Sequence, residues 1–268
     1  MIDRTKLTVA YLGGGFSGWQ KQDNARTVQG DLEACLAKLT RGDRIPVVGA
    51  GRTDSGVHAT AQVAHFDLPV AIPVDVLPRM LNERLACDLK VRSAVRAPRN
   101  FHAIASARGK HYAYRIVWRE PELPWLGIRS AVFGELSEPE TFERVCRSLP
   151  GRRDWASFTV PEVARRKTVR TIYRTDVLWR RSGLELHFFG EGFLRYQVRR
   201  MVGALLEVGR GRMAVADFND LLDSPTPGAP IPTAPARGLC LERVYYRASA
   251  RLASPPHSTG SEDSSSLW

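Results

Sequence analysis

The chain has 268 residues, enough for one large or two ordinary domains with a substantial buried core, so no disulfide or metal is needed to hold the fold. Its 39 lysines and arginines outnumber 28 acidic residues, and the net charge of +11 indicates a polyanionic partner. Only six of these basic residues are lysines. The guanidinium of arginine suits phosphate oxygens and stacks on bases, so this bias favours RNA as the partner. A GC-rich genome would also enrich arginine, but it does not explain the net excess of positive charge.

The four cysteines, Cys35, Cys87, Cys146 and Cys240, are far apart and form no Cys-x-x-Cys pair. This spacing favours reduced thiols over a disulfide framework or a zinc site. The N-terminus lacks the apolar segment of a signal peptide, and no run approaches 18 apolar residues, which excludes a membrane-spanning helix. We therefore expect a soluble, cytoplasmic protein.

The first half of the chain is predicted to run strand, helix, two strands, helix and strand. Leu7, Val9 and Tyr11 alternate with smaller or polar residues, which is typical of a strand. Thr27 is expected to cap a helix with one apolar face, and Asp75 to cap a second. Strands are expected over residues 6–11, 45–48, 62–66 and 89–95.

The second half repeats that order. A strand over residues 108–118 is expected to place Tyr112 and Tyr114 on one face. Residues Ser137 to Glu140 match a capping box with proline in the first turn of a helix. That helix is expected to bury Phe142, Val145, Cys146 and Leu149. Further strands are expected over residues 168–179, 184–189 and 239–246, and helices over 193–208 and 214–222.

Two βαββαβ units predict an α+β fold of two ferredoxin-like halves, each an antiparallel sheet with helices on one side. We expect an N-terminal domain over residues 1–104 and a C-terminal domain over residues 105–248. The remaining tail, residues 249–268, is rich in serine, proline and glycine and is expected to be disordered.

The stretch from Gly49 to Ala59 reads Gly-Ala-Gly-Arg-Thr-Asp-Ser-Gly-Val-His-Ala and lies between two predicted strands. Loops that join strands are a common position for functional side chains, and glycines let a substrate approach the backbone closely. Such a loop would present Arg52 and Asp54. A single loop aspartate also commonly stabilises a turn, so this pattern alone leaves both roles open for Asp54.

The nine residues from Gly51 to Ala59 resemble the active-site signature of the tRNA pseudouridine synthase A family. Further matches follow in the family's order along nearly the whole chain. They are Gly18-Trp19-Gln20 with Gln22, Phe101-His102-Ala103, Tyr112-x-Tyr114, Asp154-Trp155-x-Ser157-Phe158, Val198-Arg199-x-Met201-Val202-Gly203 and Gly238-Leu239-x-Leu241.

This resemblance implies that the two halves join edge to edge in one extended, mostly antiparallel sheet with a central cleft that RNA enters. It also implies that Asp54 is catalytic, that Arg52 holds the space vacated by an extruded base, and that Tyr112 stacks on that base. Arg199 matches the family arginine that pairs with the catalytic aspartate. Such a cation is needed because a buried carboxyl is otherwise protonated. No cofactor is implied. Without the resemblance, Arg199 would be a surface arginine and Tyr112 a core residue.

The activity that the resemblance implies is conversion of uridine to pseudouridine at positions 38 to 40 in the anticodon stem-loop of tRNA, by a homodimer. The alternative from another class is a catalytically silent RNA-binding protein, which a different residue at position 54 would have indicated. A third interpretation, a metal-dependent nucleic-acid hydrolase, would use His58 and His65 with Asp54. The spacing of these three residues fits no common zinc pattern, so we expect no metal site.

The sequence departs from the family pattern at three positions, Leu12, Ile104 and Ala105. Leu12 replaces an aspartate, and Ile104-Ala105 stands where the family generally has an arginine and an aromatic residue. The second departure removes an expected RNA contact near the cleft.

Overall fold

The computed structural model describes residues 3–40, 42, 44–69, 72–121, 124–164 and 167–247. The predicted disordered tail, residues 249–268, lies outside the described residues. Among the helices that are described, none combines the length and the apolar character needed to cross a membrane.

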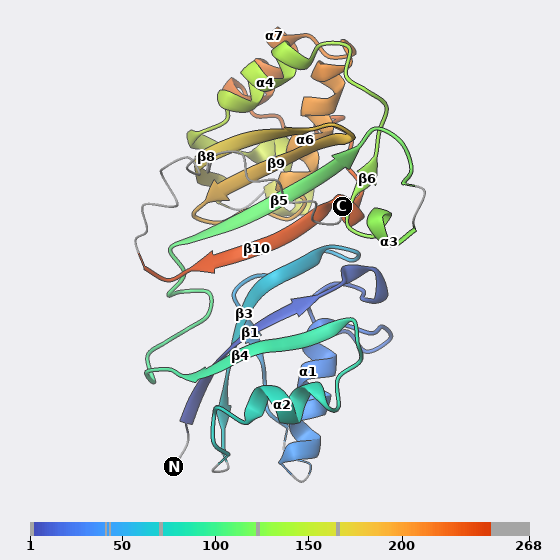
Figure 1. Ribbon diagram of the computed structural model, residues 1–268. Helices are drawn as coiled ribbons and strands as arrows, with labels where there is room; N and C mark the ends of the chain where they lie inside the picture. The colour runs from blue at the N-terminus through green and yellow to red at the C-terminus, as the bar shows by residue number, and fades with distance from the viewer. Residues whose placement is uncertain are drawn as a thin grey trace.

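The first half has the predicted βαββαβ order (Figure 1). Its elements are β1 (Asp3–Tyr11), α1 (Val28–Leu39), β2 (Val48–Gly49), β3 (His58–Leu68), α2 (Leu77–Asn82) and β4 (Leu89–Arg96). Strand β1 lies between β4 and β3 and is antiparallel to both, and β2 pairs with the other edge of β3. This order of strands is the ferredoxin-like arrangement, so the prediction for this half is confirmed.

The second half repeats the arrangement with β5 (Gly109–Val117), α4 (Pro139–Arg147), β8 (Val169–Arg180), β9 (Gly183–Gly190), α6 (Gln197–Gly209) and β10 (Leu239–Tyr245). Its strands run in the order β10, β5, β9, β8. Helix α7 (Val215–Asp223) was also predicted. Several short elements were not, namely α3 (Pro124–Gly127), β6 (Ala131–Val132), β7 (Gly151–Asp154), α5 (Pro161–Ala164) and 3-10 turns at Gly13–Gly15, Ala156–Phe158 and Ala236–Gly238.

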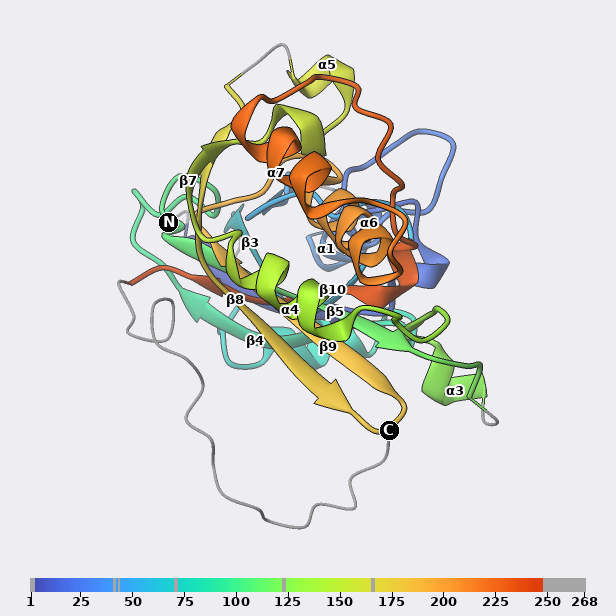
Figure 2. The same cartoon turned by 90° about the horizontal axis from the view of Figure 1, so that it is seen from above.

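The halves meet where β3 and β10 pair in parallel, with His58 opposite Cys240 and Ala59 opposite Leu241. This pairing produces one ten-stranded sheet, and among the strands that the structure describes only the β3–β10 and β5–β6 pairs are parallel. Helices α1 and α6 lie on the same side of this sheet (Figure 2). The predicted α+β class and the extended, mostly antiparallel sheet are therefore confirmed.

Helix α6 begins four residues later than predicted, at Gln197 rather than Phe193. The residue before it, Tyr196, has a φ of 62°, which makes it the one non-glycine residue with positive φ in the described chain. A helix cannot run through a residue in the left-handed region, so residues 193–196 form an irregular segment instead. The helix ends at Gly209, one residue beyond the predicted last residue, Val208.

Two predicted helix caps are wrong. Helix α2 starts after Val76 with no side-chain cap, so Asp75 does not have the predicted role. At α4 the N-cap residue is Glu138, again without a side-chain cap, and its amide donates 2.8 Å to the carbonyl of Gly209 in α6. Each helix carries proline in its first turn, which removes one of the donors that a cap would satisfy. Thr27, in contrast, accepts from the Gly30 amide as predicted.

The segment that follows α7 packs closely on α6 at Gly203. A Cβ atom at that position would lie 1.9 Å from the carbonyl oxygen of Pro232, so only glycine fits there. Two residues further on, the amide of Ala234 donates to the carbonyl of Arg199, 3.1 Å away. The close packing at Gly203 therefore positions the segment that bonds to Arg199, a candidate site residue.

We expect Gly203→Ala to lower the free energy of unfolding by about 1–3 kcal/mol, because backbone atoms of Pro232 must move. Alanine has a higher helix propensity than glycine, by about 1 kcal/mol, so without this contact the substitution would stabilise α6. Thermal unfolding followed by circular dichroism measures the change. Gly14→Ala is the matched control, since nothing lies within 4 Å of a Cβ there. An unchanged or higher Tm for Gly203→Ala would contradict the close packing.

Candidate active site

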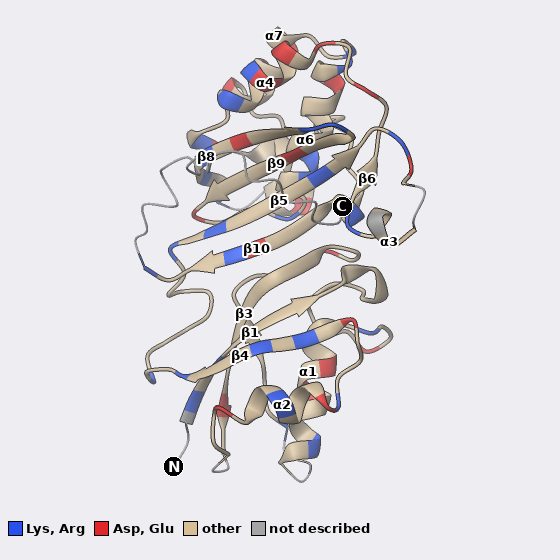
Figure 3. Ribbon diagram, in the orientation of Figure 1, with Lys and Arg blue, Asp and Glu red and all other residues tan. Residues whose placement is uncertain are grey.

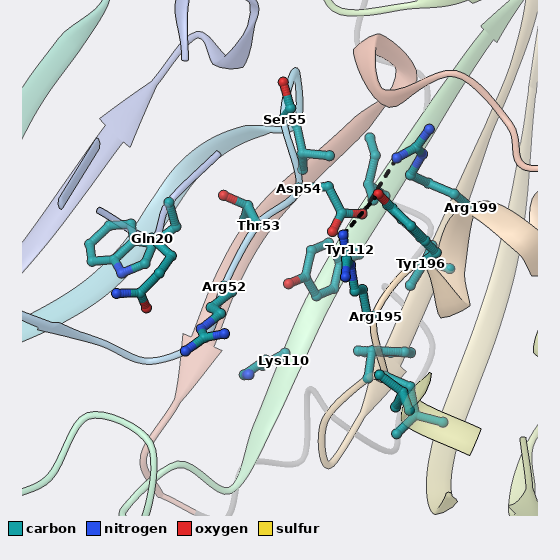
Figure 4. Close-up of a pocket in the computed structure, with 18 of the residues that line it drawn as sticks. Gln20, Arg52, Thr53, Asp54, Ser55, Lys110, Tyr112, Arg195, Tyr196 and Arg199 are labelled. Atoms are coloured by element: carbon teal, nitrogen blue, oxygen red, sulfur yellow. Dashed lines mark hydrogen bonds and ion pairs between the residues drawn. The ribbon is translucent and has the colours of Figure 1, made fainter. Parts of the chain in front are cut away.

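A cleft of about 930 Å³ lies between the halves, as the family resemblance implied. The first half contributes the loop between β2 and β3, and the second half contributes β5, α5 and residues 193–199 before and at the start of α6. All four predicted site residues, Arg52, Asp54, Tyr112 and Arg199, line it (Figure 4). Residues far apart in the sequence thus meet in a single site.

Contacts with the segment after β1 hold the Asp54 loop in place. The amide of Trp19 donates to the carbonyl of Thr53 at 3.1 Å, and the hydroxyl groups of Tyr11 and Thr53 are 2.9 Å apart. Gly13 packs so closely that a Cβ there would lie 2.2 Å from the carbonyl oxygen of Val57. Gly13 therefore supports the loop by close backbone packing, which a side chain would prevent.

Arg199 is the cation beside Asp54. Its Nη1 lies 3.5 Å from Oδ2 of Asp54, and the two side chains are 14% and 20% exposed. Its Nε donates 2.7 Å to the carbonyl of Ala234, which fixes the direction of the guanidinium. The guanidinium also lies over the ring of Tyr196, 5.1 Å from its centroid. The predicted pairing of Arg199 with Asp54 is present in the structure.

Burial and charge act on the Asp54 carboxyl in opposite directions. Burial is the largest effect and raises the pKa, while the charge and hydrogen bond of Arg199 and the charge of Arg195 lower it. The net result is a pKa above the ordinary value for aspartate. Asp54 is thus a desolvated carboxyl that depends on neighbouring arginines for its ionisation.

Tyr112 forms the floor of the cleft on β5. It is only 7% exposed, and its ring packs edge to face against Phe193, with centroids 5.3 Å apart. Burial raises the pKa of its phenol, so the hydroxyl stays protonated at neutral pH. An aromatic ring that lines a cleft in this way can stack on a base.

Arg52 differs from the other three because its side chain is exposed. Figure 4 shows it apart from the Asp54–Arg199 pair, toward the end of the cleft where Lys110 lies. An exposed guanidinium beside a cleft can donate to the oxygens of a phosphate or a carboxylate.

Other residues also line the cleft without having been predicted as site residues, among them Lys110, Arg195 and Tyr196. The guanidinium groups of Arg195 and Arg199 lie over the Tyr196 ring at 5.0 and 5.1 Å from its centroid. No local pattern signals the backbone conformation of Tyr196. Lys110 could have been found, since it precedes Tyr112 by two residues and strand alternation places both on one face.

The two histidines proposed as metal ligands have structural roles. Nδ1 of His58 accepts from the amide of Gly13 at 3.0 Å, and Nδ1 of His65 accepts from the amide of Ala103 at 3.2 Å. Burial lowers the pKa of His58 to about 4, so it is neutral. Within the described part of the chain, no three His, Cys, Asp or Glu residues gather as a metal site would require.

Comparison with known proteins agrees with this geometry. The family model described as tRNA pseudouridine synthase matches residues 7–104 and 145–247. The chain belongs to this family. It is 40% identical to tRNA pseudouridine synthase A of Latilactobacillus sakei over 252 residues, which cover 92% of this chain and 100% of that protein. The proteins of the same name from Geobacillus kaustophilus and Bacillus subtilis are 39% and 38% identical, over 92% and 91% of this chain and 95% and 99% of theirs.

Members of the tRNA pseudouridine synthase family are isomerases that convert uridine to pseudouridine, and this chain is therefore such an enzyme. Both stretches that match the family model contribute to the cleft. The first contains the Asp54 loop, and the second contains Arg199. Tyr112 lies between the two matched stretches, on the strand next to β10.

We expect Arg199→Met to raise the pKa of Asp54 further, because methionine preserves much of the apolar stem but removes the nearest positive charge. At a given pH near this pKa, more of the carboxyl is then protonated. Carbon-13 NMR titration of the aspartate carboxyl groups would measure the shift directly. Arg144→Met, an exposed position on α4, is the charge-matched control. An Asp54 pKa that is the same in all three proteins would show that Arg199 does not act on it.

Proposed function

We propose that this enzyme converts uridine to pseudouridine at positions 38 to 40 in the anticodon stem-loop of tRNA, in the cytoplasm, with Asp54 as the catalytic residue. The observation that carries the proposal is the ionisable, partly buried carboxyl of Asp54, held beside Arg199 and next to the ring of Tyr112 in the cleft between the halves. The family resemblance supplies the target positions.

The reaction is an isomerisation, so no atom is added or removed overall. The bond between C1′ of the ribose and N1 of uracil breaks, the base turns, and a new bond forms between C1′ and C5. C5 loses its proton and N1 gains one, so the product is an isomer of the substrate. The Asp54 carboxylate can begin this sequence as a nucleophile at C1′ or as a base on the ribose.

A uridine paired or stacked in a stem must leave the helix before Asp54 can reach its ribose. The cleft, at about 930 Å³, falls within the size range of pockets that enclose small ligands, so it can accept one extruded nucleoside. Tyr112 is proposed to stack on the uracil. The exposed Arg52 is proposed to occupy the space that the base leaves.

We further propose that residues 1–104 and 105–248 act as two domains that share this site. The first carries Asp54 and Arg52, and the second carries Tyr112 and Arg199. Neither half alone therefore contains the proposed catalytic carboxyl together with its cation.

Asp54→Asn is expected to reduce pseudouridine formation by roughly 10²- to 10⁴-fold or more, because an amide is neither an effective nucleophile nor a base. Cells that lack this gene would be supplied with the wild-type or the Asn variant, and pseudouridine would be mapped in their tRNA. We expect positions 38 to 40 to be modified only with the wild-type gene. Purified Asp54→Asn should keep the wild-type Tm and tRNA affinity.

Asp67→Asn is the matched control for this experiment. Asp67 lies near the far end of β3, where it pairs with Arg4 at 2.7 Å and is half exposed, so its loss should cost under about 1 kcal/mol of stability. Pseudouridine at positions 38 to 40 in cells with Asp54→Asn would exclude Asp54 as the catalytic residue. Modification by the wild type at other positions would retain the family activity but reject the proposed target.

We also infer that the enzyme is a homodimer, as the resemblance implies. The sheet face opposite Tyr112 offers a surface for such contact. On this face His111 stacks on Phe189 with ring centroids 4.1 Å apart, and Arg174 lies 3.9 Å above the same ring. His111 and His187 share a hydrogen bond of 2.8 Å. These contacts order the side chains on the sheet face that we propose a second copy covers.

Sedimentation equilibrium of the purified protein should therefore give about twice the chain mass of 29.9 kDa. A single species at 29.9 kDa across the concentrations used for activity would contradict the dimer. That result would leave the catalytic proposal for Asp54 unaffected.

A further inference from the structure

Lys110 is a cation that lines the cleft but is not part of the Asp54–Arg199 pair. It precedes Tyr112 by two residues on β5, and strand alternation points both side chains to the same face, about 7 Å apart along the strand. Both line the cleft. Figure 4 shows Lys110 on the side of Tyr112 that faces away from the Asp54–Arg199 pair, near Arg52.

The Asp54 loop is shaped to accommodate this amine. A Cβ atom at Gly51 would lie 2.6 Å from Nζ of Lys110 and 3.5 Å from its Cε. Gly51 does not have positive φ, so its backbone conformation does not require glycine. What glycine provides at this position is the space in which the lysine amine lies against the loop.

The charge of Lys110 is not balanced by the protein. Throughout the described parts of the chain, its amine makes no hydrogen bond or ion pair with another residue. Burial, with a smaller contribution from the charge of Arg170, lowers the pKa of Lys110 to about 8. Basic residues occur on strands of both halves, including β4, β5 and β10 (Figure 3).

The two ends of the cleft therefore differ in their charged groups. At one end, the negative charge of Asp54 lies 3.5 Å from Arg199, and Arg195 adds a second positive charge near it. At the other end, Lys110 and the exposed Arg52 are both positive. A desolvated amine without a counterion favours a ligand that brings a full negative charge over a neutral carbonyl.

We propose that Lys110 binds a backbone phosphate of the extruded nucleotide, with Arg52 beside it. This inference rests on the proposed function, because it takes the uracil to stack on Tyr112 with its ribose at Asp54. The phosphate attached to that ribose then reaches the positive end of the cleft. Lys110 is in this role an RNA-binding residue that sets the position of the nucleotide along β5.

This contact makes RNA binding depend on pH. A bound phosphate stabilises the charged amine, so the pKa of Lys110 is higher in the complex than in the free protein. Binding is then strongest where the free amine is already protonated. Affinity is lost as the pH rises through about 8, and the loss amounts to about tenfold between pH 7 and pH 9.

The experiment measures tRNA affinity of the full chain in an Asp54→Asn background, with a tRNA that the wild type modifies. Binding is followed by fluorescence anisotropy at pH 7 and 9 and over a range of salt concentrations. We expect Lys110→Met to weaken binding by roughly tenfold or more at pH 7. Its slope of log affinity against log salt should be smaller by about 0.7–0.9, the effect of one lost phosphate contact.

Lys110→Arg separates the charge from its titration. Arginine stays protonated at both pH values, so this variant should keep most of the affinity at pH 7 while losing the dependence on pH. Lys38→Met, an exposed lysine at the end of α1, is the control that removes one charge outside the cleft. It should leave both the affinity and the pH dependence close to those of the starting protein.

Gly51→Ala adds a test that leaves the lysine in place. Its methyl group should displace the amine and weaken binding, and the same substitution should have little further effect when Lys110 is already methionine. Equal losses in both backgrounds would show that the methyl group obstructs the RNA itself, which would count against the proposed position of the phosphate.

Two results would overturn the proposal. One is an affinity that does not change between pH 7 and pH 9 with lysine at position 110, a measurement that needs no substitution there. The other is a Lys110→Met protein with an unchanged salt slope, which would mean that the amine contacts a neutral group. These measurements report binding, whereas the Asp54 test reports conversion, so the two proposals fail separately.

Discussion

The parallel pairing of β3 with β10 is the interaction on which the site depends. It consists of only two residue pairs, but Leu241 of β10 lies opposite Ala59 of β3 on one side and opposite Tyr112 of β5 on the other. Asp54 lies only four residues before His58, the first residue of β3 and one of the two that pair with β10. This short pairing therefore places the carboxyl of one half next to the aromatic floor contributed by the other.

Side-chain contacts reinforce this junction on the opposite sheet face. Glu242 of β10 accepts from the hydroxyl of Thr60 in β3 at 2.6 Å and from Arg115 of β5 at 2.9 Å. Because one carboxylate binds donors from both halves, it helps to hold three strands in register. Charge-assisted hydrogen bonds are stronger than neutral ones. The Arg115 and Glu242 side chains that form one here are 11% and 17% exposed. A small displacement at the junction would be transmitted directly to the cleft.

Several parts of the second half hold the guanidinium of Arg199 in position. Tyr196 has a backbone conformation that usually costs about 1–3 kcal/mol, and its ring lies beneath the guanidinium. The segment that packs on Gly203 supplies the carbonyl of Ala234, which accepts from Nε of Arg199. Strain and close packing are thus concentrated next to Asp54, where a desolvated carboxyl requires a well-positioned cation.

The sequence by itself determined the two βαββαβ units, most of the strands, and a glycine-rich loop that presents Asp54 and Arg52 between β2 and β3. Period-two alternation and glycine positions are local signals, and they survive in almost any tertiary context. With the family resemblance, the sequence also indicated Tyr112 and Arg199. Only the tertiary structure decided that Arg199 lies 3.5 Å from Asp54, that α6 starts after a left-handed Tyr196, and that two predicted caps do not form. The pairing of β3 with β10 and the desolvation of Lys110 belong to the same group, because they arise from contacts between segments far apart in the chain, and no local pattern of residues encodes them.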